Sequence, residues 1–174
     1  LQKAADFIRF CDAFSIPVLS LVSATGFDTT VANEKSVARE AARLIHTFAD
    51  ASAPKVTLLT GEAYGSAYLT MSSGHIGADL VYAWPTASVG MMPAENAVKI
   101  IYNDEIDASD DAQGLIAEKA AAYAALQTSP ESAAGRGYVD AVIEPESTRQ
   151  HLIAAFEMLY SKRAVRPSKK HSTL

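Results

Sequence analysis

A short apolar run that turns abruptly into a helix constrains this chain more than any other feature. Residues 55–60, Lys-Val-Thr-Leu-Leu-Thr, are rich in β-branched and aliphatic side chains and predict a buried strand. Gly65, Ser66 and Ala67 follow, and from this turn we expect a helix to about residue 73. The first N–H groups of a helix have no internal partner, so a turn with such small side chains predicts a cradle for an oxyanion. Close packing of a helix on a sheet is the alternative interpretation of the same residues.

Length and composition indicate an ordinary globular chain. The 174 residues fit one domain with a core of its own, and the contents of 49% hydrophobic and 20% charged residues are typical of that class. The formal net charge is −5 and the pI about 5.3, with both signs mixed along the chain. This charge distribution argues against nucleic acid as a partner.

Three features predict a cytoplasmic chain that does not insert into a membrane. Cys11 is the only cysteine, so it forms no internal disulfide, and its position on an apolar helix face predicts a packing role. No apolar run approaches the roughly 18 residues that a bilayer requires, and no basic segment precedes an apolar leader.

The chain opens without Met inside a helical pattern, which suggests a piece of something longer.

Helices and single apolar strands alternate along the chain. We expect strands near residues 16–22, 55–60, 78–83, 87–91 and 138–143, and helices near residues 1–14, 33–48, 65–73, 93–101, 109–126 and 147–159. Asn33 is predicted to cap the second helix, and Ser147 with Gln150 forms a capping-box pattern before the last one. This order predicts an α/β fold with a mostly parallel sheet and sites beyond the strand ends.

Apolar spacing also predicts which helix faces are buried. The first helix carries an apolar set at helical spacing, and the helix near 109–126 carries a sparser one: Ala4, Phe7, Ile8, Cys11 and Phe14, then Leu115, Ala122, Tyr123 and Leu126. Residues 163–174 are basic and have little to bury, so we expect a domain over 1–162 followed by a solvated tail.

An ordered set of motifs resembles the carboxyltransferase subunits of biotin-dependent acyl-CoA carboxylases and decarboxylases, of the propionyl-CoA carboxylase beta and methylmalonyl-CoA decarboxylase alpha type. The resemblance is to their C-terminal half and runs nearly end to end. Its most specific parts are Ala63-Tyr64-Gly65-Ser66-Ala67-Tyr68, Tyr82-Ala83-Trp84-Pro85-Thr86-Ala87 and Arg136-Gly137-Tyr138-Val139-Asp140. Phe10-Cys11-Asp12-Ala13-Phe14 and Gly26-Phe27 lie in the expected order before them.

The resemblance implies a crotonase-like fold, a spiral of β-β-α units in a single domain. It also implies a carboxyltransferase that moves a carboxyl group between carboxybiotin and a short-chain acyl-CoA. Biotin would be held on a separate carrier protein or domain, and an N-terminal half from another subunit would complete the site. The implied partners are therefore acyl-CoA, a biotin carrier protein, that N-terminal half and further copies in a homo-oligomer, and this fragment should be inactive alone.

The implied site residues map onto the turn and its surroundings. The backbone N–H groups of Ser66 and Ala67 match the pair that stabilises negative charge on the biotin ureido oxygen. Substrate-binding positions are expected around this pair and on two nearby segments: Gly65, Tyr68, Leu69, Gly26, Phe27, Met91 and Met92. No metal is implied, and no Cys/His spacing typical of a metal site is present.

The chain departs from the family pattern at several positions. Ser66 replaces a usual Gly, Leu69 stands where propionyl-type members often carry Asp, and the loop after Gly26-Phe27 is shortened. Ser66 with His75 as its base leaves open a serine hydrolase of crotonase-like fold, resembling Clp-type proteases. A non-catalytic assembly domain is the third interpretation.

Overall fold

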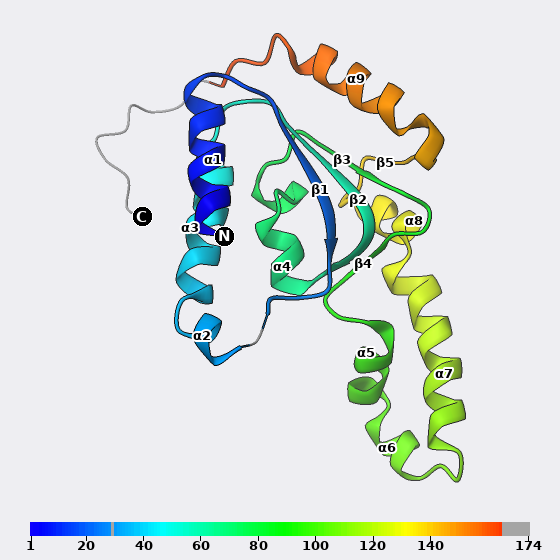
Figure 1. Cartoon of the computed structure of the whole chain (residues 1–174). Coiled ribbons are helices and arrows are strands. Elements are labelled where there is room, and N and C mark those ends of the chain that lie inside the picture. Colours follow the sequence, from blue (N-terminus) through cyan, green and yellow to red (C-terminus); the bar gives the residue numbers. More distant parts are fainter. Residues whose placement is uncertain (29, 165–174) are drawn as a thin grey trace.

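The computed structural model describes residues 1–28 and 30–164, which fold as an α/β domain (Figure 1). The elements follow in the order α1 (Gln2–Ala13), β1 (Val18–Ala24), α2 (Val31–Glu34), α3 (Val37–Asp50), β2 (Lys55–Tyr64), α4 (Gly65–Thr70), η1 (Gly74–Ile76), β3 (Leu80–Ala83), β4 (Ser88–Gly90), α5 (Ala94–Ile101), α6 (Asn103–Asp107), α7 (Ala112–Tyr123), the π-helical turn η2 (Ala124–Thr128), α8 (Pro130–Gly135), β5 (Ala141–Val142), η3 (Pro145–Ser147) and α9 (Thr148–Leu159). Helices separate β1 from β2, β2 from β3 and β4 from β5, whereas β3 and β4 follow each other without a helix, as the sequence predicts.

The sheet is parallel and centred on β2. Its strand order is β1-β2-β3-β5, and β4 pairs with the far end of β2, where Tyr64 lies opposite Gly90. Both faces of β2 are buried along residues 55–59. Because a parallel sheet needs cover on both faces, helices lie on each side of it.

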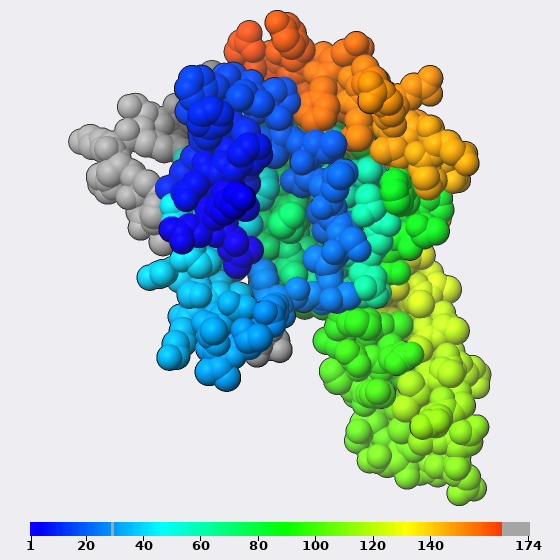
Figure 2. Space-filling model, in the orientation of Figure 1, coloured from blue at the N-terminus to red at the C-terminus, as the bar shows by residue number. Residues whose placement is uncertain are grey.

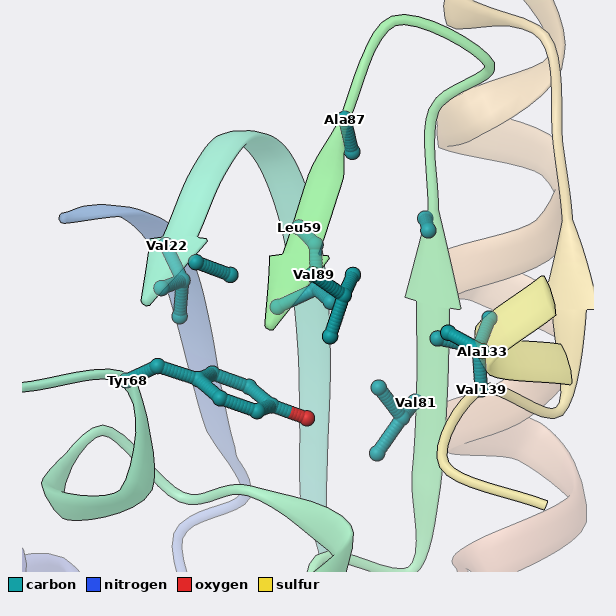
Figure 3. Packing of buried hydrophobic residues seen from close by; sticks show 10 residues of the cluster. Val22, Leu59, Tyr68, Val81, Ala87, Val89, Ala133 and Val139 are labelled. Carbon is teal, nitrogen blue, oxygen red and sulfur yellow. The ribbon is translucent and has the colours of Figure 1, made fainter. Parts of the chain in front are cut away.

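The largest buried cluster lies where α4 packs on this sheet. It joins Val22 of β1 and Leu59 of β2 to Tyr68 of α4, with Val81 and Val89 from β3 and β4 (Figure 3). A second cluster joins α1 to α3 through side chains that include Leu44 and Phe48, both buried. The α4 cluster fixes the helix start directly beyond the end of β2.

Helices α5, α6 and α7, with the π-helical turn Ala124–Thr128 at its base, form an arm that projects away from this body (Figures 1 and 2). Within the arm α5 packs against α7, while Ile100, Ile101 and Leu126 remain exposed. The arm returns to the body through the π-helical turn, which contacts β4 and α8.

Several local predictions are wrong for identifiable reasons. The helix after Gly65 ends at Thr70 instead of near residue 73, because Ser72 adopts a left-handed backbone with φ of 61°. Asn33 lies inside α2, and Ser36 is the residue before α3. Ser147 forms no side-chain cap on α9, since its hydroxyl donates to the carbonyl of Glu144.

Burial also corrects two predicted helix faces. In α1, Ile8 and Cys11 are buried, so the packing role of Cys11 is confirmed, but Phe7 is 62% and Phe14 66% exposed. In the arm, Leu126 is exposed although it was expected in the buried face, as is Ala122. Both arm residues lie beside or in the π-helical turn, which shifts the helical register.

Along residues 1–28 and 30–164, every helix is too short or too polar to span a bilayer. The cytoplasmic location stays a prediction, as does the domain boundary after residue 162. From residue 165 on, the predicted basic tail 163–174 lies outside the described residues.

Candidate functional site

The turn from β2 into α4 depends on a glycine. Tyr64 is still extended, with φ of −115° and ψ of 138°, and Gly65 then takes a positive φ of 57°. A Cβ at Gly65 would lie 3.0 Å from the carbonyl oxygen of Met91, so any side chain there would be strained and crowded. The backbone after Gly65 is therefore placed directly at the end of the central strand.

The amides of Ser66 and Ala67 lie in the first turn of α4. No side chain caps this helix, and the turns and loops of the described residues provide no carbonyl that accepts from either amide. Ser66 is exposed and Ala67 is buried. A helix start with unpartnered N–H groups at an accessible position has the donor arrangement that an oxyanion site requires.

A cavity of about 320 Å³ lies beside this turn. It brings together four of the predicted substrate-binding residues, namely Gly65, Tyr68, Leu69 and Met91. The rest of its lining comes from β4, the end of the arm and the α8–β5 segment: His75, Val89, Gly90, Tyr123, Gln127, Thr128, Ala133, Arg136 and Tyr138. The cavity thus joins α4 to the base of the arm.

The other predicted site residues lie elsewhere. Ser66, Ala67 and Met92 are not part of the cavity lining; of the two residues that follow Gly65, Ser66 is exposed and Ala67 is buried. Gly26 is exposed, and Phe27 lines a separate cavity of about 270 Å³ with Asn33 and Val37. The structure therefore does not bring Gly26, Phe27 or Met92 to the Gly65 cavity.

Tyr68 contributes its ring to the core as well as to the cavity wall. It is 4% exposed, and its Oη has no hydrogen-bond partner among the described residues. Figure 3 shows the hydroxyl directed toward Val81. Burial raises the pKa of Tyr68 to about 12, so the phenol stays neutral at physiological pH.

The residues at the base of the arm were missed by reasoning from sequence. Gln127 and Thr128 lie in a π-helical turn, and sequence periodicity carries no signal for such a turn. Arg136 stands in a motif that supports the resemblance, but the motif did not indicate its contacts. Its guanidinium donates to the carbonyl oxygens of Leu126 and Gln127, at 3.3 Å each, and to Oε1 of Gln127.

His75 and Ser66 do not form a nucleophile–base pair. The His75 ring packs edge-on against Tyr138 at a centroid distance of 4.8 Å and against Tyr68 at 6.4 Å. Within the described chain no hydrogen bond joins Ser66 Oγ to His75, and only His75 lines the cavity. The serine hydrolase interpretation gains no contact from this geometry.

A larger cavity, about 930 Å³, lies away from the turn. It is a mainly apolar groove beneath α9, where Pro17 and Trp84 face Leu152, Ile153 and Phe156. The indole of Trp84 donates to Thr148 Oγ1 at 2.8 Å, which attaches the start of α9 to the sheet. This groove follows from incomplete cover of the sheet by one helix and lacks the donor arrangement of the Gly65 turn.

Comparison with known proteins agrees with the fold and the motifs. Residues 1–174 match the carboxyl transferase domain family, and this chain belongs to that family. It is 45% identical over 174 residues to the carboxyltransferase subunit of propionyl-CoA carboxylase from Haloferax mediterranei, covering 99% of this chain and 34% of that protein. It is 43% identical over 171 residues to the methylmalonyl-CoA carboxyltransferase 12S subunit of Propionibacterium freudenreichii, covering 98% of this chain and 33% of that protein.

Solved structures give the same result. The transcarboxylase 12S crystal structure, a hexamer assembly with methylmalonyl-CoA bound, superposes with a TM-score of 0.94 at 42% identity over 99% of this chain and 33% of that one. The beta subunit of geranyl-CoA carboxylase from Pseudomonas aeruginosa gives a TM-score of 0.79 at 25% identity, covering 98% of this chain and 33% of that one. The fold is the crotonase-like carboxyltransferase fold, and the chain spans about one third of the length of these relatives.

Proposed function

We propose that this chain is the biotin-binding part of a carboxyltransferase that moves a carboxyl group between carboxybiotin and a short-chain acyl-CoA. Biotin is presented by a separate carrier, and the acyl-CoA is held by an N-terminal half from another subunit of a homo-oligomer. The proposal is supported by the family match over residues 1–174 and by relatives that carry this activity in their names. The observation that carries it is the start of α4 after Gly65, where Ser66 is exposed and where no carbonyl in the described turns and loops accepts from the amides of Ser66 and Ala67.

The residues at the turn fit a biotin ring approaching the backbone. Gly65 takes the positive φ of 57° from which α4 starts, and the absence of a side chain there lets a ligand come close to the backbone of the turn. When bound, biotin supplies the transferred carboxyl group on its ureido ring. The two amides stabilise negative charge on the ureido oxygen, and a donor of this kind is worth about 3–4 kcal/mol at a transition state.

This account requires no side-chain nucleophile at Ser66. Ser66 is exposed, and its hydroxyl can donate a hydrogen bond in addition to the one from the backbone amide. Leu69, on the cavity wall one helical turn from Gly65, gives the cavity an apolar side chain close to the amides. Replacing Ser66 with Gly, the residue usual in the family, should leave carboxyl transfer within about threefold because the amide remains.

A hybrid protein tests the proposed function. This chain replaces the matching third of the P. freudenreichii 12S subunit, and labelled carboxyl transfer from methylmalonyl-CoA to free biotin is measured. We expect transfer by the hybrid and none by the isolated chain, because the acyl-CoA part of the site is absent from the latter. A correctly assembled hybrid without any transfer would overturn the proposal and support an assembly role.

A serine-directed activity probe separates the hydrolase interpretation from the proposal. Labelling of Ser66 that disappears in Ser66→Ala, together with loss of activity, would show a nucleophile. The carboxyltransferase account predicts no labelling and near-normal transfer in Ser66→Ala, since alanine keeps the backbone N–H.

A further inference from the structure

The cavity beside Gly65 is closed on its far side by the π-helical turn Ala124–Thr128. In this turn the chain leaves the regular α-helical register of α7, and Gln127 and Thr128 enter the cavity wall. Thr128 Cγ2 lies so close to β4 that a Cβ at Gly90 would approach it to 3.0 Å. The width of the cavity therefore depends on the position of this turn.

Arg136 holds the turn through its guanidinium, and its side chain also lines the cavity. The last carbonyls of a helix have no internal donor, and here the carbonyl oxygens of Leu126 and Gln127 accept from the guanidinium at 3.3 Å. Ser132 Oγ also donates to the Leu126 carbonyl, at 2.7 Å. A planar group with several fixed donors suits these diverging acceptors better than an ammonium would.

The lining of the cavity specifies the chemistry of its ligand. Leu69, Val89 and Ala133 form apolar wall, while Tyr123 and Tyr138 add aromatic rings. Arg136 is the one formally charged side chain among the lining residues given above, and its Nη atoms are already engaged by the π-helical turn. Such a site suits a neutral, mostly apolar ring and offers no cluster of cations for the phosphates of coenzyme A.

We propose that this cavity receives the ring system of biotin and that Arg136 is a positioning residue that keeps the cavity open by holding the π-helical turn. The inference rests on the proposed function, because Gly65, which lines this cavity, directly precedes Ser66 and Ala67, whose amides are assigned to the ureido oxygen. Arg136 itself does not touch the reacting atoms. It acts through Gln127 and Thr128.

The test uses the hybrid protein with Arg136→Met, which keeps the aliphatic stem and removes the guanidinium. Arg39→Met, another exposed arginine far along the chain on α3, is the matched control. Calorimetric titration with free d-biotin should show about tenfold weaker binding for Arg136→Met, the effect of losing hydrogen bonds to a charged group, and no change for Arg39→Met. Arg136→Lys should recover part of the affinity.

Steady-state kinetics should show the same difference between Arg136→Met and the Arg39→Met control. Arg136→Met should raise KM for free biotin about tenfold, while kcat and KM for methylmalonyl-CoA stay within about twofold, because a ground-state binding site has been altered. Unchanged biotin binding and KM, in a hybrid that still transfers carboxyl groups, would overturn the inference and leave the proposed function intact. A selective rise in KM for methylmalonyl-CoA would instead assign the cavity to the acyl group and equally overturn it. A hybrid that binds biotin in an Arg136-dependent way without transfer would sink the proposed function alone.

Discussion

The body around β2 and the arm formed by α5, α6 and α7 are stabilised in different ways. In the body, Val56, Leu58 and Leu59 are almost completely buried, and both faces of the central strand are covered. In the arm, Ile101 and Leu126 are more than half exposed, although both are large aliphatic side chains. The centre of the body therefore owes its stability to burial within this chain, whereas the arm, like the outer face of α1, presents apolar surface outward.

The comparison explains where the cavity lies. Its inner wall comes from α4 and β4, which are fixed by the body, and its outer wall comes from the π-helical turn at the base of the arm. The buried body thus fixes the turn at Gly65, whereas Arg136 holds the outer wall, in which Thr128 is buried and Gln127 is exposed. Substitutions should accordingly act on global stability in the body and on ligand binding at the base of the arm.

The largest expected effect comes from the centre of the body. Leu59→Ala removes a fully buried side chain and should lower the free energy of unfolding by about 3 kcal/mol. Leu126→Ala in the arm, where the side chain is 69% exposed, should change it by less than about 0.5 kcal/mol. Urea denaturation of both variants checks the comparison, and equal losses would contradict the division between body and arm.

Asp79 shows how a charged side chain stabilises the body, for comparison with the ion pair of the arm. Its Oδ2 accepts from the backbone N–H of Lys55 at 2.7 Å and from Lys162 Nζ at 2.8 Å, both partly buried. Asp79→Ala should cost about 2 kcal/mol, because hydrogen bonds to a charged group are lost at the start of β2. The measurement is the shift of the urea midpoint at constant m value, and a loss below about 0.5 kcal/mol would show that these bonds contribute little.

Because the phenol of Tyr68 is buried, the stability of the chain should fall at alkaline pH. Its folded-state pKa of about 12 lies above the ordinary value of 10.0, so its contribution is fully present below pH 10 and is lost as pH rises toward 12. Relative to Tyr68→Phe, the parent chain should lose roughly 1 kcal/mol of stability between pH 9 and 11. Equal pH dependence in both proteins would contradict burial of the phenol. At neutral pH the variant should be as stable as the parent or slightly more so, since the Oη has no partner.

The smallest effect belongs to the arm. Lys119 Nζ lies 3.0 Å from Glu105 Oε2, and the Glu105 side chain is more than half exposed. Glu105→Ala should therefore leave the stability almost unchanged, because solvent screens an exposed pair. Thermal denaturation at low and high salt would reveal a larger contribution if the arm were more rigid than its burial indicates.

Reasoning from sequence was most successful where one residue type has one structural use. The strand at 55–60 and the turn at Gly65 were predicted because a buried apolar run followed by small residues has few alternatives, and φ at Gly65 is indeed positive. The end of α4 was missed because Ser72, not a glycine, adopts the left-handed conformation there. The arm was misjudged because the π-helical turn breaks the 3.6-residue period on which the buried face was predicted.

The site residues also separate into those that the sequence predicted correctly and those that it did not. Gly65, Tyr68, Leu69 and Met91 meet at one cavity, three of them within a single helical turn and Met91 through contact between its carbonyl and Gly65. Gly26 and Phe27 were assigned from the family pattern, but they follow β1 and lie elsewhere. Arg136 acts through carbonyl oxygens nine and ten residues away, and such contacts leave no mark in local sequence.

The most direct test of the account is removal of one backbone N–H without loss of the helix. In the hybrid protein, Ser66→Pro deletes the amide at a first-turn position, where the missing donor breaks no helical bond, and Ser66→Ala keeps it. Circular dichroism and assembly state should match between the two variants. We predict that carboxyl transfer to free biotin falls at least about a hundredfold in Ser66→Pro and stays near the parent value in Ser66→Ala. Equal transfer by both variants would contradict a role for this amide.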